Sequence, residues 1–164
     1  MSKSEKNLAE AFAGESQANR KYLAFAKKAD EEGLTQVARL FRAAAAAETI
    51  HALAHLRVLK GVGGTADNLK EAIGGETHEF TDMYPQMIAD AKEEDNKGAL
   101  MSFMYANAVE KIHAALYQKA LAAMSDLAET AYFVCDVCGN TVEGEAPDRC
   151  PICGMSKDHF MEID

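Results

Sequence analysis

Apolar residues recur at alternating spacings of three and four positions along the first third of the chain, a pattern typical of helices that pack in an antiparallel bundle. The pattern predicts one helix that ends at Gly33 and a second that runs from Thr35 to about Lys60. The first stripe is Leu8, Phe12, Glu15, Asn19, Tyr22, Ala26 and Ala29. The second stripe is Val37, Leu40, Phe41, Ala44, Glu48, His51, His55 and Val58. Ionisable residues lie within both stripes, so the expected buried faces are not purely hydrophobic.

The same pattern returns after a short glycine-rich linker. A third helix is expected to carry Glu76 and Glu79 on its inner face, with a kink or a restart at Pro85 because proline lacks a backbone donor. A fourth helix is expected from about Lys97 to Glu129. We therefore predict an all-α four-helix bundle over residues 1–130.

The second pair of helices repeats the first. A Glu-x-x-His motif occurs once in each pair, and a Gly-Glu step precedes it in each pair. The corresponding residues are Glu15 and Glu76 at a separation of 61, and Glu48 and Glu110, His51 and His113, and Tyr22 and Tyr84 at a separation of 62. A duplicated helix pair is the simplest explanation, and each copy would contribute half of a common site.

Glutamate and histidine side chains fall on the inner faces of all four expected helices. A buried carboxylate needs a cation or strong hydrogen bonds, because burying an unpaired charge is expensive. One Glu from each of two helices and a Glu-x-x-His motif from each of the other two form the ligand set of di-iron and di-manganese carboxylate bundles. The candidate ligands are Glu15, Glu48, His51, Glu76, Glu79, Glu110 and His113.

Glu79 is one carboxylate more than this minimum set, and the first pair has alanine at the matching position 18. The five glutamates exceed by one negative charge what two ferrous ions neutralise. We hypothesise that Glu79 detaches on reduction and that neutral His51 replaces it. Crystal structures with unchanged ligands in both oxidation states would refute this exchange.

The composition changes after Glu129, where a second domain is expected at residues 131–164. Two Cys-x-x-Cys-Gly segments there bring four thiolates to one tetrahedral metal ion. The pattern by itself fits a structural zinc ribbon or a one-electron iron centre, and a redox carrier beside a di-iron bundle favours iron. The ligands are Cys135, Cys138, Cys150 and Cys153.

Charge and hydropathy exclude several classes of function. The formal net charge of the 164-residue chain is −9, whereas nucleic-acid binding needs a basic face. No stretch approaches the roughly 20 apolar residues of a membrane span, and the N-terminal residues have no apolar signal core. We therefore expect a soluble, cytoplasmic protein that binds neither nucleic acid nor a membrane.

The motifs resemble those of the rubrerythrin family over essentially the whole chain. The resemblance is carried by Ala-Gly-Glu-Ser-Gln-Ala-Asn, Glu-Thr-Ile-His, Gly-Glu-x-x-Glu, Glu-Lys-Ile-His and Cys-Pro-x-Cys-Gly. It implies a ferritin-like bundle followed by a rubredoxin-like domain, and a non-haem peroxidase that reduces hydrogen peroxide to water in protection against oxidative stress. By this resemblance the seven Glu and His residues bind two irons, the four cysteines bind one iron, and Tyr22 and Tyr84 lie beside the di-iron site.

The electron donor implied by this function is a rubredoxin or an NAD(P)H-dependent reductase. A fourth helix that continued from His113 to Glu129 would carry the chain about 24 Å away from the di-iron site, at roughly 1.5 Å per residue. We therefore predict a head-to-tail homodimer in which one chain's cysteine site faces its partner's di-iron site. The glycines at 61–64 also permit exchange of helix pairs between chains.

Two other functions use parts of the same residue set. A ferroxidase or iron-handling ferritin-like protein needs the Glu and His ligands but not four cysteines. A metal-sensing interaction module would use the cysteine domain as a binding ribbon, which leaves Glu79 unexplained. Assembly size distinguishes the first alternative from the peroxidase, and visible absorption of the cysteine site distinguishes the second.

Overall fold

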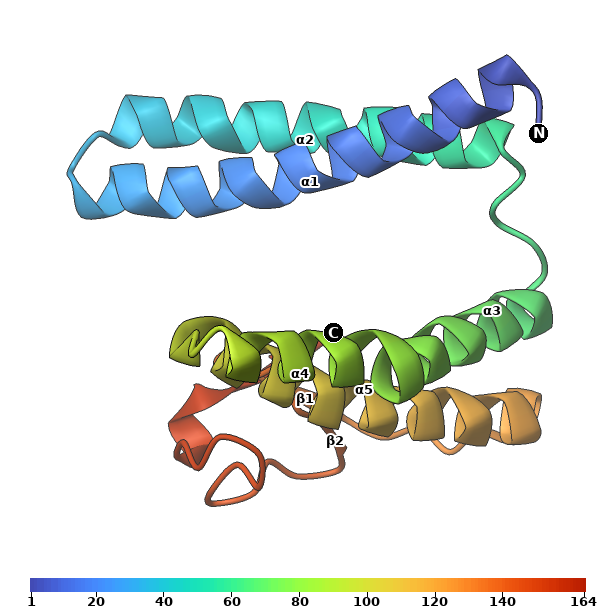
Figure 1. Ribbon diagram of the computed structural model, residues 1–164, viewed down its shortest axis with the longest axis vertical. Coiled ribbons are helices and arrows are strands. Elements are labelled where there is room, and N and C mark those ends of the chain that lie inside the picture. Colours follow the sequence, from blue (N-terminus) through green and yellow to red (C-terminus); the bar gives the residue numbers. More distant parts are fainter. The chain divides into compact units, whose positions relative to one another are not determined.

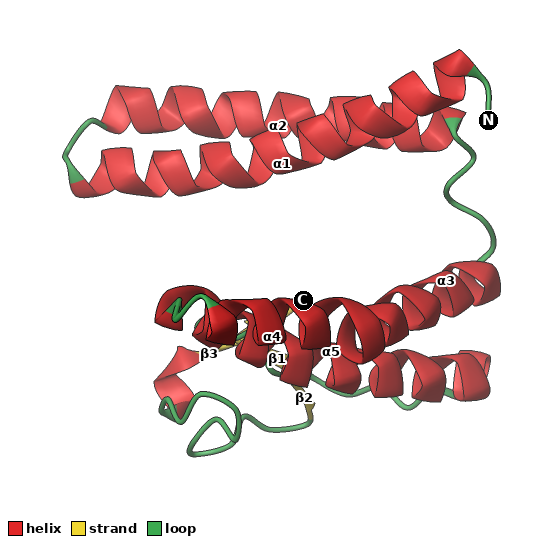
Figure 2. Cartoon of the chain, viewed as in Figure 1, coloured by secondary structure: helices red, strands yellow, loops and turns green.

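The computed structural model describes all residues from 1 to 164, in two compact units. The first unit spans Met1–Gly63 and the second spans Gly64–Asp164. The prediction of a mostly helical chain with a small C-terminal strand-and-knuckle domain is confirmed (Figure 2). No helix is long and apolar enough to cross a membrane.

The first unit is a hairpin of two antiparallel helices, α1 (Lys3–Glu31) and α2 (Thr35–Val58), which lie side by side in Figure 1. A capping box starts α1, since Ser2 accepts from the backbone N–H of Glu5 and the Glu5 carboxylate accepts from that of Ser2. Gly33 allows the tight turn between the helices because its φ of 76° lies in the left-handed region.

The helices of this hairpin meet through small residues. Ala38, Ala45 and Ala52, seven residues apart, are the buried positions of α2, and buried Asn19 of α1 donates to the carbonyl of Ala45 at 2.7 Å. Several larger residues of the stripe that the sequence suggested for α2 are exposed instead, among them Leu40 at 67%. Part of the predicted stripe does face α1, since Phe41 lies against the rings of Tyr22 and Phe25. The most buried contacts are nevertheless those of the alanines, which allow the closer approach of two backbones.

The second unit begins with α3 (Thr65–His78), which continues through a π-helical turn at Glu79–Met83 into α4 (Tyr84–Glu93). Pro85 lies in the first turn of α4, directly after the π-helical turn, where a missing N–H costs little. The change from π-helix to α-helix takes the place of the kink or restart that the sequence predicted there. The hydrophobic pattern does not predict the π-helical turn.

The last long helix, α5, spans Lys97–Ala123 and is shorter than predicted. The expected end at Glu129 is wrong, because Met124 takes a φ of 46° and only one 3₁₀ turn, Met124–Asp126, follows. The chain then returns toward α5, where β2 residues contact His113 and Lys119. The predicted helical extension that would carry the chain away from His113 is therefore absent.

A three-stranded antiparallel sheet forms the C-terminal domain, in the order β2-β1-β3. Its strands are β1 (Tyr132–Cys135), β2 (Thr141–Glu143) and β3 (Phe160–Ile163). Val134 pairs with Thr141, and Cys135 pairs with Phe160. We call residues 131–164 the Cys domain. The sheet belongs to the same compact unit as α3, α4 and α5.

Candidate metal centres

The first unit brings three of the predicted ligands together. Glu15 of α1 lies opposite Glu48 and His51 of α2, and one ligand atom of each lies within 4.8 Å of the others. His51 Nδ1 is 2.9 Å from Glu48 Oε2 and 3.9 Å from Glu15 Oε1. One turn of helix between Glu48 and His51 places both side chains on the same face. Two carboxylates and one imidazole at this spacing are donors that could hold a metal ion, and we call this cluster the first half-site.

The second unit contains the matching cluster of Glu76, Glu110 and His113, again within 4.8 Å. His113 Nδ1 is 2.8 Å from Glu110 Oε2 and 3.8 Å from Glu76 Oε1. These distances differ by 0.1 Å from those of the first cluster. The sequence duplication thus appears as two half-sites with nearly equal internal geometry.

The second half-site concentrates negative charge. Burial, followed by a hydrogen bond with Glu110 and by the charges of Glu110 and Glu79, raises the pKa of Glu76 to about 7. Carboxylates that repel one another in this way are stabilised by a cation. The donor set of two oxygens and one nitrogen fits iron as well as other divalent transition metals.

Glu79 is near this half-site but outside the cluster of three. It lies at the start of the π-helical turn, and its charge acts on Glu76 and on Tyr84. Burial, followed by the charges of Glu79, Glu110 and Glu76, raises the pKa of the Tyr84 hydroxyl. Tyr84 therefore lies within the electrostatic influence of these three carboxylates.

Tyr22, the first-half counterpart of Tyr84, lies among aromatic rings. Its ring centroid is 6.3 Å from that of Phe25 and 6.2 Å from that of Phe41. Tyr84 in turn lies 6.3 Å from Phe103. Both tyrosines thus contact an apolar ring. The carboxylates whose charges act on Tyr84 belong to the second unit.

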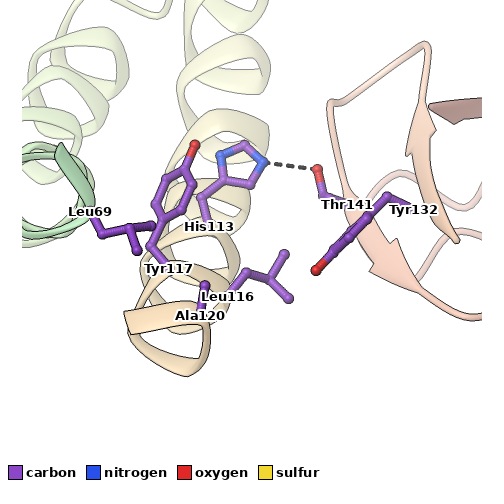
Figure 3. A pocket seen from close by; sticks show the side chains of 7 residues that line it. All are labelled: Leu69, His113, Leu116, Tyr117, Ala120, Tyr132 and Thr141. Atoms are coloured by element: carbon purple, nitrogen blue, oxygen red, sulfur yellow. Dashed lines mark hydrogen bonds between the residues drawn. The ribbon is translucent and has the colours of Figure 1, made fainter. Parts of the chain in front are cut away.

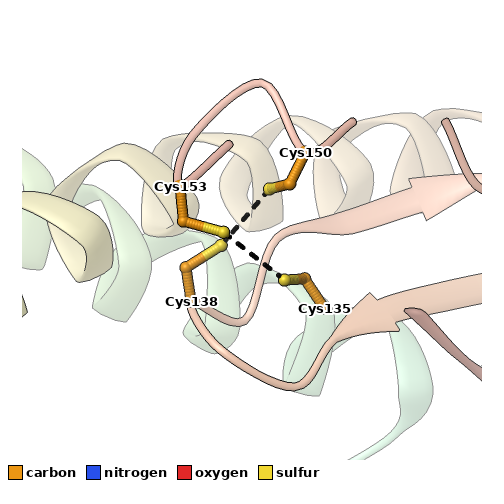
Figure 4. Close-up of side chains that lie close together, drawn as sticks. All are labelled: Cys135, Cys138, Cys150 and Cys153. Atoms are coloured by element: carbon orange, nitrogen blue, oxygen red, sulfur yellow. Dashed lines mark hydrogen bonds between the residues drawn. The ribbon is translucent and has the colours of Figure 1, made fainter. Parts of the chain in front are cut away.

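Four cysteines converge in the Cys domain (Figure 4). The Sγ atoms of Cys135 and Cys153 are 3.7 Å apart, and those of Cys138 and Cys150 are 3.5 Å apart. None of the four is in a disulfide bond. Four sulfur atoms at this spacing fit one tetrahedral metal ion, since metal–sulfur bonds are about 2.3 Å long for zinc.

The two Cys-x-x-Cys-Gly knuckles have the same backbone geometry. Gly139 and Gly154 have φ values of 81° and 77°, and their N–H groups donate to the carbonyls of Cys135 and Cys150. Left-handed backbone at both positions requires glycine and allows each chain segment to turn tightly beneath its sulfur atoms.

Backbone donors and burial act in opposite directions on the thiols. Burial opposes ionisation of Cys150, but the N–H groups of Cys153 and Ile152 donate to its sulfur, and the pKa falls to about 7. Burial is the largest influence on Cys138 and raises the pKa of its thiol. The Cys150 thiol is thus prepared for ionisation before a cation binds, whereas the Cys138 thiol requires the cation.

The Cys domain contacts α5 beside the second half-site. His113 Nε2 is 2.9 Å from the Thr141 hydroxyl of β2 (Figure 3). Lys119 Nζ lies 2.7 Å from Glu143 Oε2, and this hydrogen bond lowers the pKa of the Glu143 carboxyl. A cavity of about 320 Å³ lies between these elements, lined by Leu69, His113, Leu116, Tyr117, Ala120, Tyr132 and Thr141. No sequence motif points to Thr141, because its contact with His113 is made only in the folded chain.

These features define a class of protein: a helical non-haem metalloprotein whose carboxylate and histidine half-sites are combined with a rubredoxin-like cysteine domain. A family model described as "Rubrerythrin" matches residues 6–121, and one described as "Rubrerythrin, rubredoxin-like domain" matches residues 133–161. The chain belongs to the rubrerythrin family, whose members are di-iron oxidoreductases. Its cofactors are accordingly a di-iron centre and one iron in a four-cysteine site.

Similar proteins cover nearly the whole chain. Rubrerythrin-2 of Clostridium acetobutylicum is 38% identical over 171 residues, which cover 94% of this chain and 93% of that protein. Nigerythrin of Nitratidesulfovibrio vulgaris is 40% identical over 171 residues, covering 94% of this chain and 83% of that protein. Among solved structures, partially reduced nigerythrin matches with a TM-score of 0.61 and 35% identity, covering 99% of this chain and 88% of that one.

The raised pKa of Glu76 predicts a pH dependence for the metal-free protein. Folded Glu76 keeps its proton up to about pH 7, whereas the unfolded chain releases it near the ordinary glutamate pKa of 4.5. The folded state therefore binds more protons between these values, and its stability falls as the pH rises through that range. Urea unfolding of metal-free protein from pH 4.5 to pH 8 measures this slope.

Glu76→Gln removes the titrating group and is expected to flatten the slope. Glu93→Gln, an exposed position on α4, is the control and is expected to leave the slope unchanged. Equal slopes in wild type and Glu76→Gln would contradict the assignment of the raised pKa to Glu76.

Proposed function

We propose that the two half-sites combine into one dinuclear iron site with seven protein ligands. The matched distances within the two clusters support this, because each cluster has the donors of one half of a carboxylate-bridged pair. Exposed apolar residues on the helices support a bundle that covers them, including Leu40 and Ile50 of α2 and Met104 of α5. The proposed ligands are Glu15, Glu48, His51, Glu76, Glu79, Glu110 and His113.

The proposed reaction is the reduction of hydrogen peroxide to two water molecules, which consumes two electrons and two protons. Two ferrous ions supply the two electrons when they are bound. The chain contributes carboxylates that neutralise the cations and two imidazoles that hold them through Nδ1. A solved relative described as fully reduced, all-ferrous nigerythrin, 35% identical with a TM-score of 0.60, supports the ferrous state as the starting point.

The observation that carries this proposal is the contact between the Cys domain and the second half-site. Thr141, which lies 2.9 Å from His113, is three residues beyond the ligand Cys138. A four-thiolate iron in this place is suited to return electrons one at a time to the carboxylate site. An iron-storage protein has no need for such a neighbour.

The electron donor is proposed to be a rubredoxin or an NAD(P)H-dependent reductase in the cytoplasm. A homodimer also remains a proposal, supported by the exposed apolar residues of the helices. The head-to-tail arrangement was predicted from a fourth helix that carries the Cys domain far from the di-iron site. That argument does not apply, because α5 ends at Ala123 and the Cys domain contacts His113 of its own chain. Light scattering of the iron-loaded protein tests the homodimer.

Stopped-flow spectroscopy of anaerobically reduced protein tests the function. The protein is mixed separately with hydrogen peroxide and with dioxygen, and the ferric-thiolate colour is followed. We expect rapid return of the colour with peroxide and slow return with dioxygen. Faster reaction with dioxygen would indicate an oxidase or ferroxidase, and a colourless iron-replete protein would indicate a zinc ribbon.

A further inference from the structure

His113 differs from its duplicate His51 in what lies beyond the half-site. Both direct Nδ1 toward carboxylates, at 2.8 Å and 2.9 Å from the nearest oxygen. Nε2 of His113 also meets the Thr141 hydroxyl at 2.9 Å, a contact with no counterpart in the first unit. The side chain of His113 is accordingly 27% exposed, compared with 55% for His51.

The direction of this hydrogen bond follows from the second partner of Thr141. Its hydroxyl donates to the carbonyl of Gly139 at 3.1 Å, and a hydroxyl has only one proton to donate. When a metal ion occupies Nδ1, the oxygen therefore accepts from Nε2–H of His113. An imidazole that carries its proton on Nε2 leaves the Nδ1 lone pair free for a metal ion, in the direction of Glu76 and Glu110.

Thr141 is held in place from three sides. Its strand β2 pairs with β1, where Val134 is its partner. Two residues further along β2, Glu143 is bound by Lys119 of α5. On the knuckle side, Gly139 lies against α5, where an added Cβ would be in ordinary van der Waals contact, at 3.8 Å, with a methyl group of buried Val109. The hydroxyl is thus a fixed acceptor rather than a mobile surface group.

We propose that Thr141 is a positioning residue for His113, and that it fixes the imidazole in the tautomer that offers Nδ1 to a metal ion at Glu76 and Glu110. The inference rests on the proposed metal site and assigns part of its organisation to the Cys domain. The same knuckle that contributes Cys138 then orients a ligand of the carboxylate site.

Three variants test this role. Thr141→Val keeps the shape but removes the acceptor, Thr141→Ser keeps the hydroxyl, and Thr65→Val is a control for the same change at an exposed position on α3. Affinity for Fe²⁺ is measured anaerobically by competition with a chromophoric chelator. The protonated nitrogen of His113 is identified by ¹⁵N NMR of the protein loaded with diamagnetic Zn²⁺.

Thr141→Val is expected to bind one Fe²⁺ about 10- to 100-fold more weakly, the usual effect of losing a hydrogen bond to a metal-binding histidine. His113 in this variant is expected to lose its single Nε2–H form. Thr141→Ser and Thr65→Val are expected to behave as wild type. Wild-type affinity and an unchanged Nε2–H signal in Thr141→Val would overturn the proposal, and so would loss of the ferric-thiolate colour, which would mean that Thr141 maintains the Cys domain instead.

These readouts separate the inference from the proposed peroxidase function. A wild-type protein that fails to reduce peroxide while Thr141→Val still weakens Fe²⁺ binding would refute the peroxidase and support the positioning role. If wild type reduces peroxide, and Thr141→Val has wild-type affinity for Fe²⁺ and an unchanged Nε2–H signal, the positioning role alone would be refuted.

Discussion

Replacing Glu110 with glutamine is expected to lower peroxide reduction at least about 100-fold and to reduce iron occupancy of the carboxylate site. Loss of a side chain that only hydrogen-bonds to a metal ligand lowers metal affinity or activity about 10- to 100-fold. Glu110 is itself a proposed ligand, and its Oε2 lies 2.8 Å from His113 Nδ1. Glutamine preserves the side chain's size but removes the charge that neutralises the cations. Turnover with peroxide and iron content per chain measure the two effects.

The matched control for this experiment is Glu93→Gln, which removes the same charge from an exposed position on α4. It is expected to retain wild-type turnover. The visible spectrum of the four-cysteine iron should be normal in both variants, because its ligands are untouched. If Glu110→Gln retained full iron content and rate, Glu110 would not be a ligand.

Removing the metal from the cysteine site is expected to unfold the sheet of the Cys domain while leaving α1 to α5 helical. Few residues of this domain are buried, namely Cys135, Asn140, Ala146 and Cys150. A segment of this size cannot bury enough apolar surface to order itself, so metal binding must supply the stabilisation. Structural zinc sites in small domains provide about 10–16 kcal/mol in apparent binding free energy.

Hydrogen exchange with mass spectrometry measures this effect along the chain. Amides of β1 and β3 are expected to lose protection in metal-free protein, and those of α1 are expected to keep it. Restoring the metal to wild type should restore protection, whereas the double variant Cys138→Ser/Cys153→Ser should stay unprotected. Protected strands in that variant would show that the sheet folds without the metal.

The sequence predicted the composition of each half-site because local geometry determines most of it. A Glu-x-x-His motif within a helix necessarily presents both side chains on one face, and the structure places Glu48 near His51 and Glu110 near His113 at almost equal distances. The cysteine cluster follows from its glycine-ended knuckles in the same way. The predicted domain boundary near residue 130 does not coincide with the division into compact units, which falls after Gly63.

The contact face of α2 and the end of α5 were harder to predict. A hydrophobic stripe records which residues avoid water, but it does not record which neighbour covers them, so the alanine contact at Ala38 and Ala45 was missed. No glycine or proline marks the end of α5, where Met124 adopts left-handed backbone. Thr141 had no pattern at all, because it acts through residues that are distant in sequence.

The π-helical turn did leave a trace in the sequence. Glu15 and Glu76 are 61 residues apart, but Tyr22 and Tyr84 are 62 apart, so the second copy has one additional residue between these positions. A π-helical turn accommodates an extra residue without ending the helix, and Glu79–Met83 lies within this interval. Glu79, which has alanine at the matching position of the first half, is the first residue of this turn.

The Cys domain and α5 belong to one compact unit, which determines how far their two metal-binding clusters lie from each other. The cysteine cluster and the Glu76, Glu110 and His113 cluster are joined by local contacts within Gly64–Asp164. The spacing between the two clusters is therefore set without any contribution from the hairpin of Met1–Gly63. A change in the length of the glycine linker would leave this spacing unaltered.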